Sequence, residues 1–100
     1  MITTQTKLEI KTTKNFKKQL KKIIKQGKDI NKFTYVLEKL ANKEELEPKY
    51  RNHNLINDKL YYNCKECHIE PDWLLVYQYH NEDIILLLIA TGSHSDLFNS

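Results

Sequence analysis

The sequence has little of what interrupts or cross-links a chain. Among its 100 residues are two glycines, two prolines and two cysteines. So few breakers predict long regular elements and exclude a low-complexity or linker-rich chain. Two cysteines are too few for a disulfide scaffold, and without an export signal they indicate reduced thiols. We expect no such signal, because Met1–Lys7 contains no apolar stretch.

Long apolar runs are also missing. A membrane-spanning helix needs roughly 20 apolar residues, whereas the longest run, Ile84–Ala90, has the length of a strand. Hydrophobic residues make up 40% of the chain and charged residues 29%, which excludes a disordered tail. This length and composition predict a single domain over residues 1–100 without a membrane partner, and the two reduced cysteines without an export signal predict the cytoplasm.

Acidic residues are nearly absent from the first part of the chain. Residues 1–28 hold nine lysines and one acid, Glu9, a balance of +8, whereas residues 29–100 have a balance of −5. A lobe with a charge of +8 favours a polyanion or an acidic protein as a partner. A solvated lysine face without any partner gives the same pattern, and both interpretations stay open on charge alone.

Residues 8–41 have the patterns of one short strand and two helices. Alternation over residues 8–11 predicts a first strand. Thr12 or Thr13 can cap a helix whose apolar residues recur at helical spacing, and Gly27 can end it. Asp29 can cap a second amphipathic helix that runs to Ala41. Two such helices joined by a short turn form a helical hairpin.

The second half of the chain has strand patterns. Residues 42–57 are polar and predict a loop, after which residues 60–69, 73–79 and 84–89 predict three strands. Pro71 marks the first turn between them, because it cannot donate to a ladder. The predicted class is α+β, with two N-terminal helices packed on an antiparallel sheet of three to four strands.

The string Cys64-Lys65-Glu66-Cys67-His68 matches the Cys-x-x-Cys-His pattern of c-type haem attachment. A zinc site of Cys64, Cys67, His68 and His53 is a second possibility, but its ligands would have to converge. In a strand, Cys64 and Cys67 face opposite sides of the sheet. We therefore favour one small core cysteine and one surface thiol, and predict no metal site.

The four histidines offer acid–base chemistry. His68 lies near a strand end, Asp72 follows it across a turn, and His94 comes just after the last strand. An antiparallel sheet can gather such groups over one face. Cleavage of a phosphodiester needs one group to accept a proton and another to donate one, and an ordinary histidine, with a pKa of roughly 6.5, can serve in either role.

Three segments together resemble a known family. His68–Tyr77, Thr91–Phe98 and Tyr50–Leu55 are similar, in order and near spacing, to the motifs of the YafQ branch of the RelE/ParE toxin superfamily. The resemblance covers nearly the whole chain, including the lysine-rich first helix, and it implies a RelE-like fold.

The resemblance implies the toxin of a type II toxin–antitoxin system. Such a toxin enters the ribosomal A site and cuts the bound mRNA, with the RNA's own 2′-OH as nucleophile, so that neither a metal nor another cofactor is required. The implied partners are a cognate antitoxin protein, the ribosome and mRNA. The toxin–antitoxin complex would bind operator DNA through the antitoxin.

The resemblance also implies the site residues. His94 or Asp72 would take the 2′-OH proton, and His68 or His53 would support the phosphate charge or protonate the leaving oxygen. An aromatic ring can stack on any base, which is the role implied for Phe98. Trp73 is a further stacking candidate, although it could equally be a core aromatic. The catalytic set is thus His53, His68, Asp72, His94 and Phe98, and the RNA-binding set is Lys17, Lys18, Lys21, Lys22, Lys25, Lys65 and Trp73.

Two positions depart from the family pattern. Ala90 and Lys65 stand where many relatives have arginine. Arginine binds phosphate through a bidentate fork, lysine is a point charge, and alanine makes no such contact. Ala90 therefore keeps an alternative open, a non-catalytic module that binds only the antitoxin and RNA.

Overall fold

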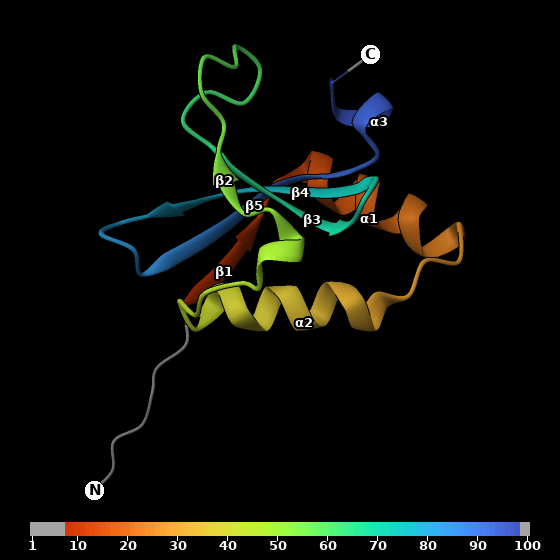
Figure 1. Cartoon of the computed structure of the whole chain (residues 1–100). Helices are drawn as coiled ribbons and strands as arrows, with labels where there is room; N and C mark the ends of the chain where they lie inside the picture. The colour runs from red at the N-terminus through yellow and green to blue at the C-terminus, as the bar shows by residue number, and fades with distance from the viewer. Residues whose placement is uncertain (1–7, 99–100) are drawn as a thin grey trace, which may run out of the picture.

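The computed structural model describes residues 8–98, which form two long helices on one face of a five-stranded sheet (Figure 1). The segment 1–7, on which the expectation about export rests, lies outside the described residues. The α+β class predicted from the sequence is confirmed. No helix within residues 8–98 combines the length and the apolar character needed to cross a membrane.

Both predicted helix caps are confirmed. Helix α1 (Lys14–Lys25) begins at Thr13, whose Oγ1 accepts a hydrogen bond from the Phe16 amide at 3.0 Å. The same hydroxyl donates to the Ile89 carbonyl at 2.8 Å, which fixes the start of the helix to the sheet. Helix α2 (Ile30–Ala41) begins at Asp29, whose carboxylate accepts from the Asn31 amide at 3.0 Å. Side-chain oxygens at this position satisfy amides that lack an intrahelical partner.

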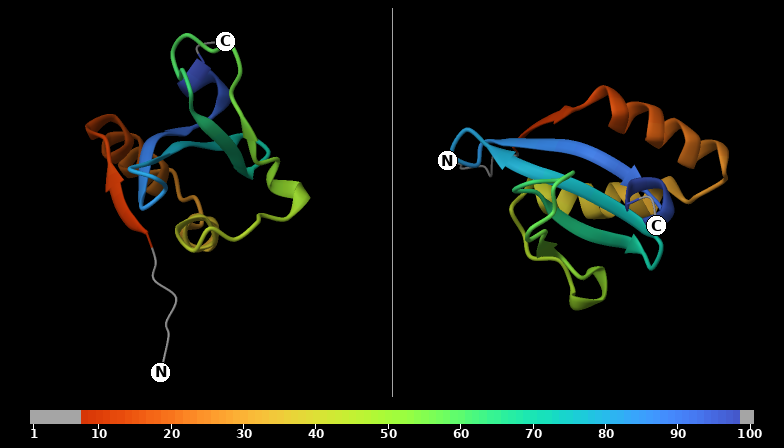
Figure 2. Two further views of the ribbon diagram at one scale, coloured as in Figure 1. Left: turned by 90° about the vertical axis from the view of Figure 1, so that its left-hand side faces the viewer. Right: turned by 90° about the horizontal axis from the view of Figure 1, so that it is seen from above.

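The sheet has five strands rather than the predicted three to four, in the order β1-β5-β4-β3-β2. Neighbouring strands are antiparallel except β1, which runs parallel to β5. A parallel pair needs a long crossover connection, and here the chain from α1 to β4 provides it (Figure 2). The strands are β1 (Glu9–Thr12), β2 (His53–Asn54), β3 (Lys65–Glu70), β4 (Trp73–His80) and β5 (Ile85–Gly92).

The prediction for residues 53–69 is wrong in two places. The strand expected from residue 60 begins only at Lys65, because Asp58 holds the preceding residues in turns. Its Oδ1 accepts from the amides of Leu60 at 2.9 Å and Tyr61 at 2.8 Å. Conversely, the segment predicted as a loop contains β2, which pairs with β3 through only two residues. A 3₁₀ turn, η1 (Pro48–Tyr50), leads into it.

The sheet separates two apolar clusters. One lies under α1 and α2 and includes Cys67, and the other lies on the opposite face and includes Cys64. Helix α3 (His94–Phe98) contributes Leu97 to the second cluster. Both cysteines are buried, with 5% of Cys64 and none of Cys67 exposed, so the expectation of a surface thiol is wrong. The turn before β3 folds Cys64 into the second cluster instead.

Glu70, at the end of β3, connects the sheet to the helices. Its two carboxylate oxygens each lie 2.9 Å from a lysine Nζ, one from Lys28 before α2 and one from Lys32 within it. Hydrogen bonds from Lys32 and Lys28 lower the pKa of Glu70. The stabilisation from this carboxylate is therefore complete above its ordinary pKa of about 4.5 and is lost as the pH falls through the lowered value.

We expect Glu70→Gln to lower the free energy of unfolding by about 1 kcal/mol at pH 7, because partly exposed ion pairs contribute little each. The difference between variant and wild type should shrink as the pH falls below about 4. Urea denaturation of the variant and the wild type at pH 7 and at pH 2 measures this difference in the free energy of unfolding. An equal difference at pH 7 and pH 2 would show that the carboxylate charge does not carry the effect.

Candidate active site

Three histidines from separate parts of the chain lie in a row. The ring centres of His53 and His68 are 6.3 Å apart, and those of His68 and His94 are 5.6 Å apart. Glu66 and Asp72 lie within ion-pair distance of these rings. We refer to these three histidines and two carboxylates as the histidine cluster. Titratable groups gathered in this way are a common sign of acid–base catalysis.

Strand pairing explains half of the cluster. His53 of β2 is paired directly with Glu66 of β3, and side chains of directly opposed residues in an antiparallel pair point to the same face. His68 is two residues further along β3 and therefore shares that face. The other half comes from two chain reversals: Asp72 lies in the turn between β3 and β4, and His94 begins α3 directly after β5.

Asp72 holds His94 through two contacts. Its Oδ1 accepts from the His94 backbone amide at 2.8 Å and lies 2.7 Å from the ring Nδ1. Both contacts lower the pKa of Asp72, and the hydrogen bond from the backbone amide has the larger effect. The carboxylate is therefore ionised near neutrality. An ionised carboxylate only accepts hydrogen bonds. The hydrogen of the neutral ring therefore lies on Nδ1, and Nε2 keeps its lone pair.

Glu66 lies between the other two histidines. Only 5% of this residue is exposed, and its Oε1 is 3.3 Å from His53 Nε2 and 3.5 Å from His68 Nε2. The remaining nitrogens also face acceptors: His53 Nδ1 is 2.6 Å from the Arg51 carbonyl and His68 Nδ1 is 3.3 Å from the Pro71 carbonyl. Each of the two rings therefore has an oxygen atom beside both of its nitrogens.

Glu66 was not among the residues predicted from the sequence, although a signal for it exists. It stands two residues before His68 in a strand pattern, and strand side chains two apart share a face. Glu66 also lies within the Cys-x-x-Cys-His string, a pattern that indicates a role for the cysteines and the histidine rather than for the glutamate. A buried carboxylate needs partners, and Glu66 lies within ion-pair distance of the two histidines.

If the chain carries out the RNA cleavage that its motifs imply, Glu66→Gln should lower the maximal cleavage rate by about tenfold to a hundredfold, or roughly 1.4–2.7 kcal/mol of barrier. Glutamine keeps the volume but removes the charge that positions two imidazoles. The concentration of substrate at half-maximal rate should change by less than about threefold, and Glu66→Asp should recover part of the rate. Equal losses in the Gln and Asp variants would indicate a packing role only.

The two predicted aromatic residues have different surroundings. Phe98 lies one helical turn after His94 on α3, half-buried, with its ring edge-on to Tyr61 at 5.3 Å. Residues four apart share one side of a helix, so Phe98 is placed beside the cluster. Trp73 is only 1% exposed, and its indole donates to Thr91 Oγ1 at 3.0 Å. A ring buried in this way cannot stack on RNA, so the expectation for Trp73 is corrected to a core role.

The predicted lysines divide into two groups. Those of α1 are exposed, and the helix contains no acidic residue. One of them, Lys22, forms an ion pair at 3.4 Å with Asp96 of α3, which places α1 next to the helix that carries His94. Lys65 lies elsewhere: it alternates with Glu66 along β3 and so points to the opposite face of the sheet. The exposed lysines of α1 are Lys14, Lys17, Lys18, Lys21, Lys22 and Lys25.

The haem and zinc alternatives lack the convergence that they require. Cys64 and Cys67 belong to apolar clusters on opposite faces of the sheet. Burial raises the pKa of the Cys67 thiol to about 12, which disfavours the thiolate that a metal needs. Within residues 8–98 no group of three or more histidine, cysteine or acidic side chains is placed to hold a metal ion.

Comparison with known proteins places this fold among bacterial toxins. A crystal structure of a metal-bound toxin from Helicobacter pylori is 42% identical, covers 91% of this chain and 99% of its own, and has a TM-score of 0.83. The crystal structure of the Escherichia coli DinJ–YafQ complex is 33% identical, covers 91% of this chain and 98% of the matched one, and has a TM-score of 0.79.

The sequence comparison is equally direct. The mRNA interferase toxin YafQ of Escherichia coli strain B / BL21-DE3 is 34% identical over 91 residues, which are 90% of this chain and 95% of the relative. Residues 8–99 match the model of the YafQ family, bacterial toxins of type II toxin–antitoxin systems. The chain therefore belongs to the YafQ toxin family, and the resemblance inferred from its motifs is confirmed.

Proposed function

We propose that this YafQ-family toxin is a ribosome-dependent endoribonuclease that cleaves mRNA in the A site, with the RNA's 2′-OH as nucleophile and without a metal. Family membership makes the chain a type II toxin of the mRNA interferase kind. The observation that carries the mechanism is the convergence of His53, His68 and His94 with two carboxylates. Attack by a neighbouring 2′-OH needs only a proton acceptor, a proton donor and stabilisation of charge on the phosphate.

His94 is the proposed general base. Asp72 fixes hydrogen on Nδ1, so Nε2 presents a lone pair. About half of the His94 side chain is exposed, which leaves the ring accessible to the 2′-OH. We assign Asp72 to the positioning of His94, because its Oδ1 accepts two hydrogen bonds from that residue.

His68 and His53 are the proposed acid and phosphate-binding groups. Each ring has an oxygen acceptor within contact distance of both nitrogens. A protonated imidazole can give a proton to the leaving oxygen or stabilise a developing negative charge. His68 lies in the centre of the row and is next to the base, so we assign it to the phosphate and assign His53 to the leaving oxygen.

Helix α1 provides the proposed ribosome contact. Lys14, Lys18, Lys21 and Lys25 recur at spacings of four, three and four residues and so form one stripe on the helix. None of these four forms an ion pair with the described residues. Exposed and unpaired lysines next to a nuclease site suit the phosphate backbone of rRNA, whose attraction is strong but independent of sequence.

We expect the double variant Lys18→Gln, Lys21→Gln to bind ribosomes more weakly and with a smaller salt dependence. The slope of log affinity against log salt should fall by roughly one per lost phosphate contact. The double variant Lys39→Gln, Lys49→Gln makes the same change of charge away from α1 and is the control. The affinity is measured by sedimentation with ribosomes over a salt series. Equal slopes in the two double variants would contradict a ribosome contact through α1.

The proposed partners follow from the family and the charge. The DinJ–YafQ complex shows that a relative assembles with an antitoxin, and we propose a cognate antitoxin for this chain, through which the complex binds operator DNA. An antitoxin that covers α1 would need acidic groups to match its lysines. Action on ribosomes would place the toxin in the cytoplasm.

The function is tested with purified protein, ribosomes programmed with a defined mRNA, and the same mRNA free in solution. We expect cleavage of the ribosome-bound message at the A-site codon and at least a hundredfold slower cleavage of the free message. Equal rates on both substrates would remove the ribosome from the mechanism. Salt-sensitive ribosome binding without cleavage would instead identify the non-catalytic module that Ala90 suggests.

A further inference from the structure

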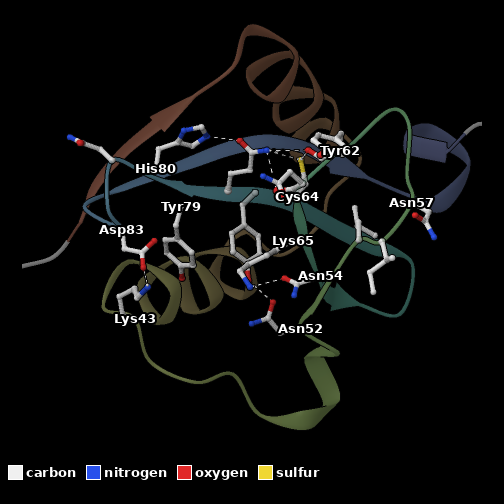
Figure 3. Close-up of a pocket in the computed structure, with 16 residues that line it drawn as sticks. Lys43, Asn52, Asn54, Asn57, Tyr62, Cys64, Lys65, Tyr79, His80 and Asp83 are labelled. Carbon is white, nitrogen blue, oxygen red and sulfur yellow. Dashed lines mark hydrogen bonds and ion pairs between the residues drawn. The ribbon is translucent and has the colours of Figure 1, made fainter.

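A pocket of about 960 Å³ lies beside β2 and outside the histidine cluster (Figure 3). It forms because β3 begins only at Lys65. The β3–β4 ladder stops at Lys65 and Tyr77, while β4 continues to His80. The missing length of β3 leaves a gap in the sheet, with residues 55–64 on one side and the β4–β5 hairpin on the other.

Two asparagine amides on β2 and next to it face this gap in a fixed orientation. Asn54 Oδ1 accepts from Lys65 Nζ at 2.7 Å, and a lysine ammonium can only donate. Asn52 Oδ1 accepts from the Tyr77 hydroxyl; burial raises the pKa of Tyr77, which keeps that hydroxyl protonated. Because both oxygens are occupied, the asparagines are left with their NH₂ groups as donors toward the pocket.

The pocket is thus a cluster of donors with a positive charge. Lys65 adds the spare hydrogens of its ammonium to the two asparagine amides. The acidic residue of the lining, Asp83, is already paired with Lys43 at 3.1 Å. Donors that converge around one lysine match the oxygens of a phosphate. Figure 3 shows Asn52, Asn54 and Lys65 close together on one side of the pocket.

The cluster and the pocket are joined by β2. Asn52 and Asn54 flank His53 in the sequence, and neighbouring strand residues point to opposite faces. Because β2 is the edge strand, an RNA strand with one phosphate against the histidine cluster can pass around it and place another phosphate in the pocket. Tyr62, exposed by 78%, lines the same pocket and offers a ring for a base.

We propose that Asn52, Asn54 and Lys65 form a second RNA subsite, which binds a backbone phosphate of the message next to the nucleotide that is cleaved. This inference rests on the proposed function, since it takes the histidine cluster as the place of cleavage. The subsite would set the position of the message and so the linkage of the A-site codon at which the chain cuts.

The test measures binding apart from cleavage. In the His94→Ala background, ribosomes are programmed with mRNAs that carry a single uncharged methylphosphonate at successive linkages near the A-site codon. One linkage beside the cleavage position should weaken binding by about tenfold, as expected for a charge-assisted contact. In the further variant Asn54→Asp, Lys65→Met, that linkage should lose its effect, while Lys49→Met, which also removes one lysine, should retain it.

Two results would overturn the subsite. One is an unchanged methylphosphonate profile in the Asn54→Asp, Lys65→Met variant. The other is a loss of antitoxin binding with ribosome binding intact, which would identify the pocket as a peptide site. Failure of the proposed function has a different signature: the chain with His94 intact would not cleave ribosome-bound mRNA, whatever the binding profile shows.

Discussion

His94→Ala should lower the cleavage of ribosome-bound mRNA by about 10²–10⁴-fold, the usual contribution of a general acid–base group. The loss should occur in the maximal rate, because alanine removes the Nε2 that we propose as the acceptor of the 2′-OH proton. It should not disturb the fold: about half of the side chain is exposed, and the backbone amide at this position still donates to Asp72. The rate is measured in single-turnover reactions with excess toxin.

Two controls separate this result from misfolding. The thermal unfolding midpoint of His94→Ala should lie within about 2 °C of the wild type, as for an exposed substitution, and the variant should keep its affinity for the antitoxin. A fully active His94→Ala protein would remove the proposed base. In that case Asp72, the second candidate from the sequence, would have to accept the proton directly.

Trp73→Ala should lower the free energy of unfolding by about 3–5 kcal/mol, the range for truncating a buried tryptophan. The side chain is among the largest buried ones, in the cluster beneath the helices, and its indole donates to Thr91. Trp73→Phe should fall in between, since it keeps an aromatic ring but loses the hydrogen bond. Urea denaturation measures all three proteins.

The same series tests the correction of the stacking role. A base-stacking tryptophan on the surface would give the opposite pattern, with little change in unfolding and weaker binding of programmed ribosomes. We expect Trp73→Phe to bind programmed ribosomes within about threefold of the wild type. A change in stability below about 1 kcal/mol together with a large loss of ribosome binding would restore Trp73 to the RNA-binding set.

Local signals in the sequence predicted the elements that depend on local interactions. Caps at Thr13 and Asp29 mark the helix starts, because each satisfies amides within three residues. The pairing of β1 with β5 was not predictable in this way, since four alternating residues do not indicate which distant strand they join. β2 was missed for the same reason: two residues carry no periodicity, and only β3 makes them a strand.

In the site, too, residues with local sequence signals were predicted, whereas residues whose role depends on tertiary structure were not. His68, Asp72 and His94 were found because motifs surround them, and the structure brings them together with His53. Trp73 was assigned a stacking role and Glu66 was missed, because the role of each residue depends on its burial. Motif membership does not distinguish a core tryptophan from an exposed one, and a charged residue in a strand is ordinarily solvated. Only the pairing of His53 with Glu66 shows that this carboxylate is held inside the site.

The measurement that tests the central claim most directly uses an mRNA with one 2′-deoxynucleotide at the mapped cleavage position. If His94 activates the RNA's own 2′-OH, removal of this single oxygen should abolish cleavage there, and the unmodified message should end in a 2′,3′-cyclic phosphate. Cleavage of the deoxy-substituted message at an undiminished rate would mean that water is the nucleophile, and the roles assigned to the histidine cluster would be wrong.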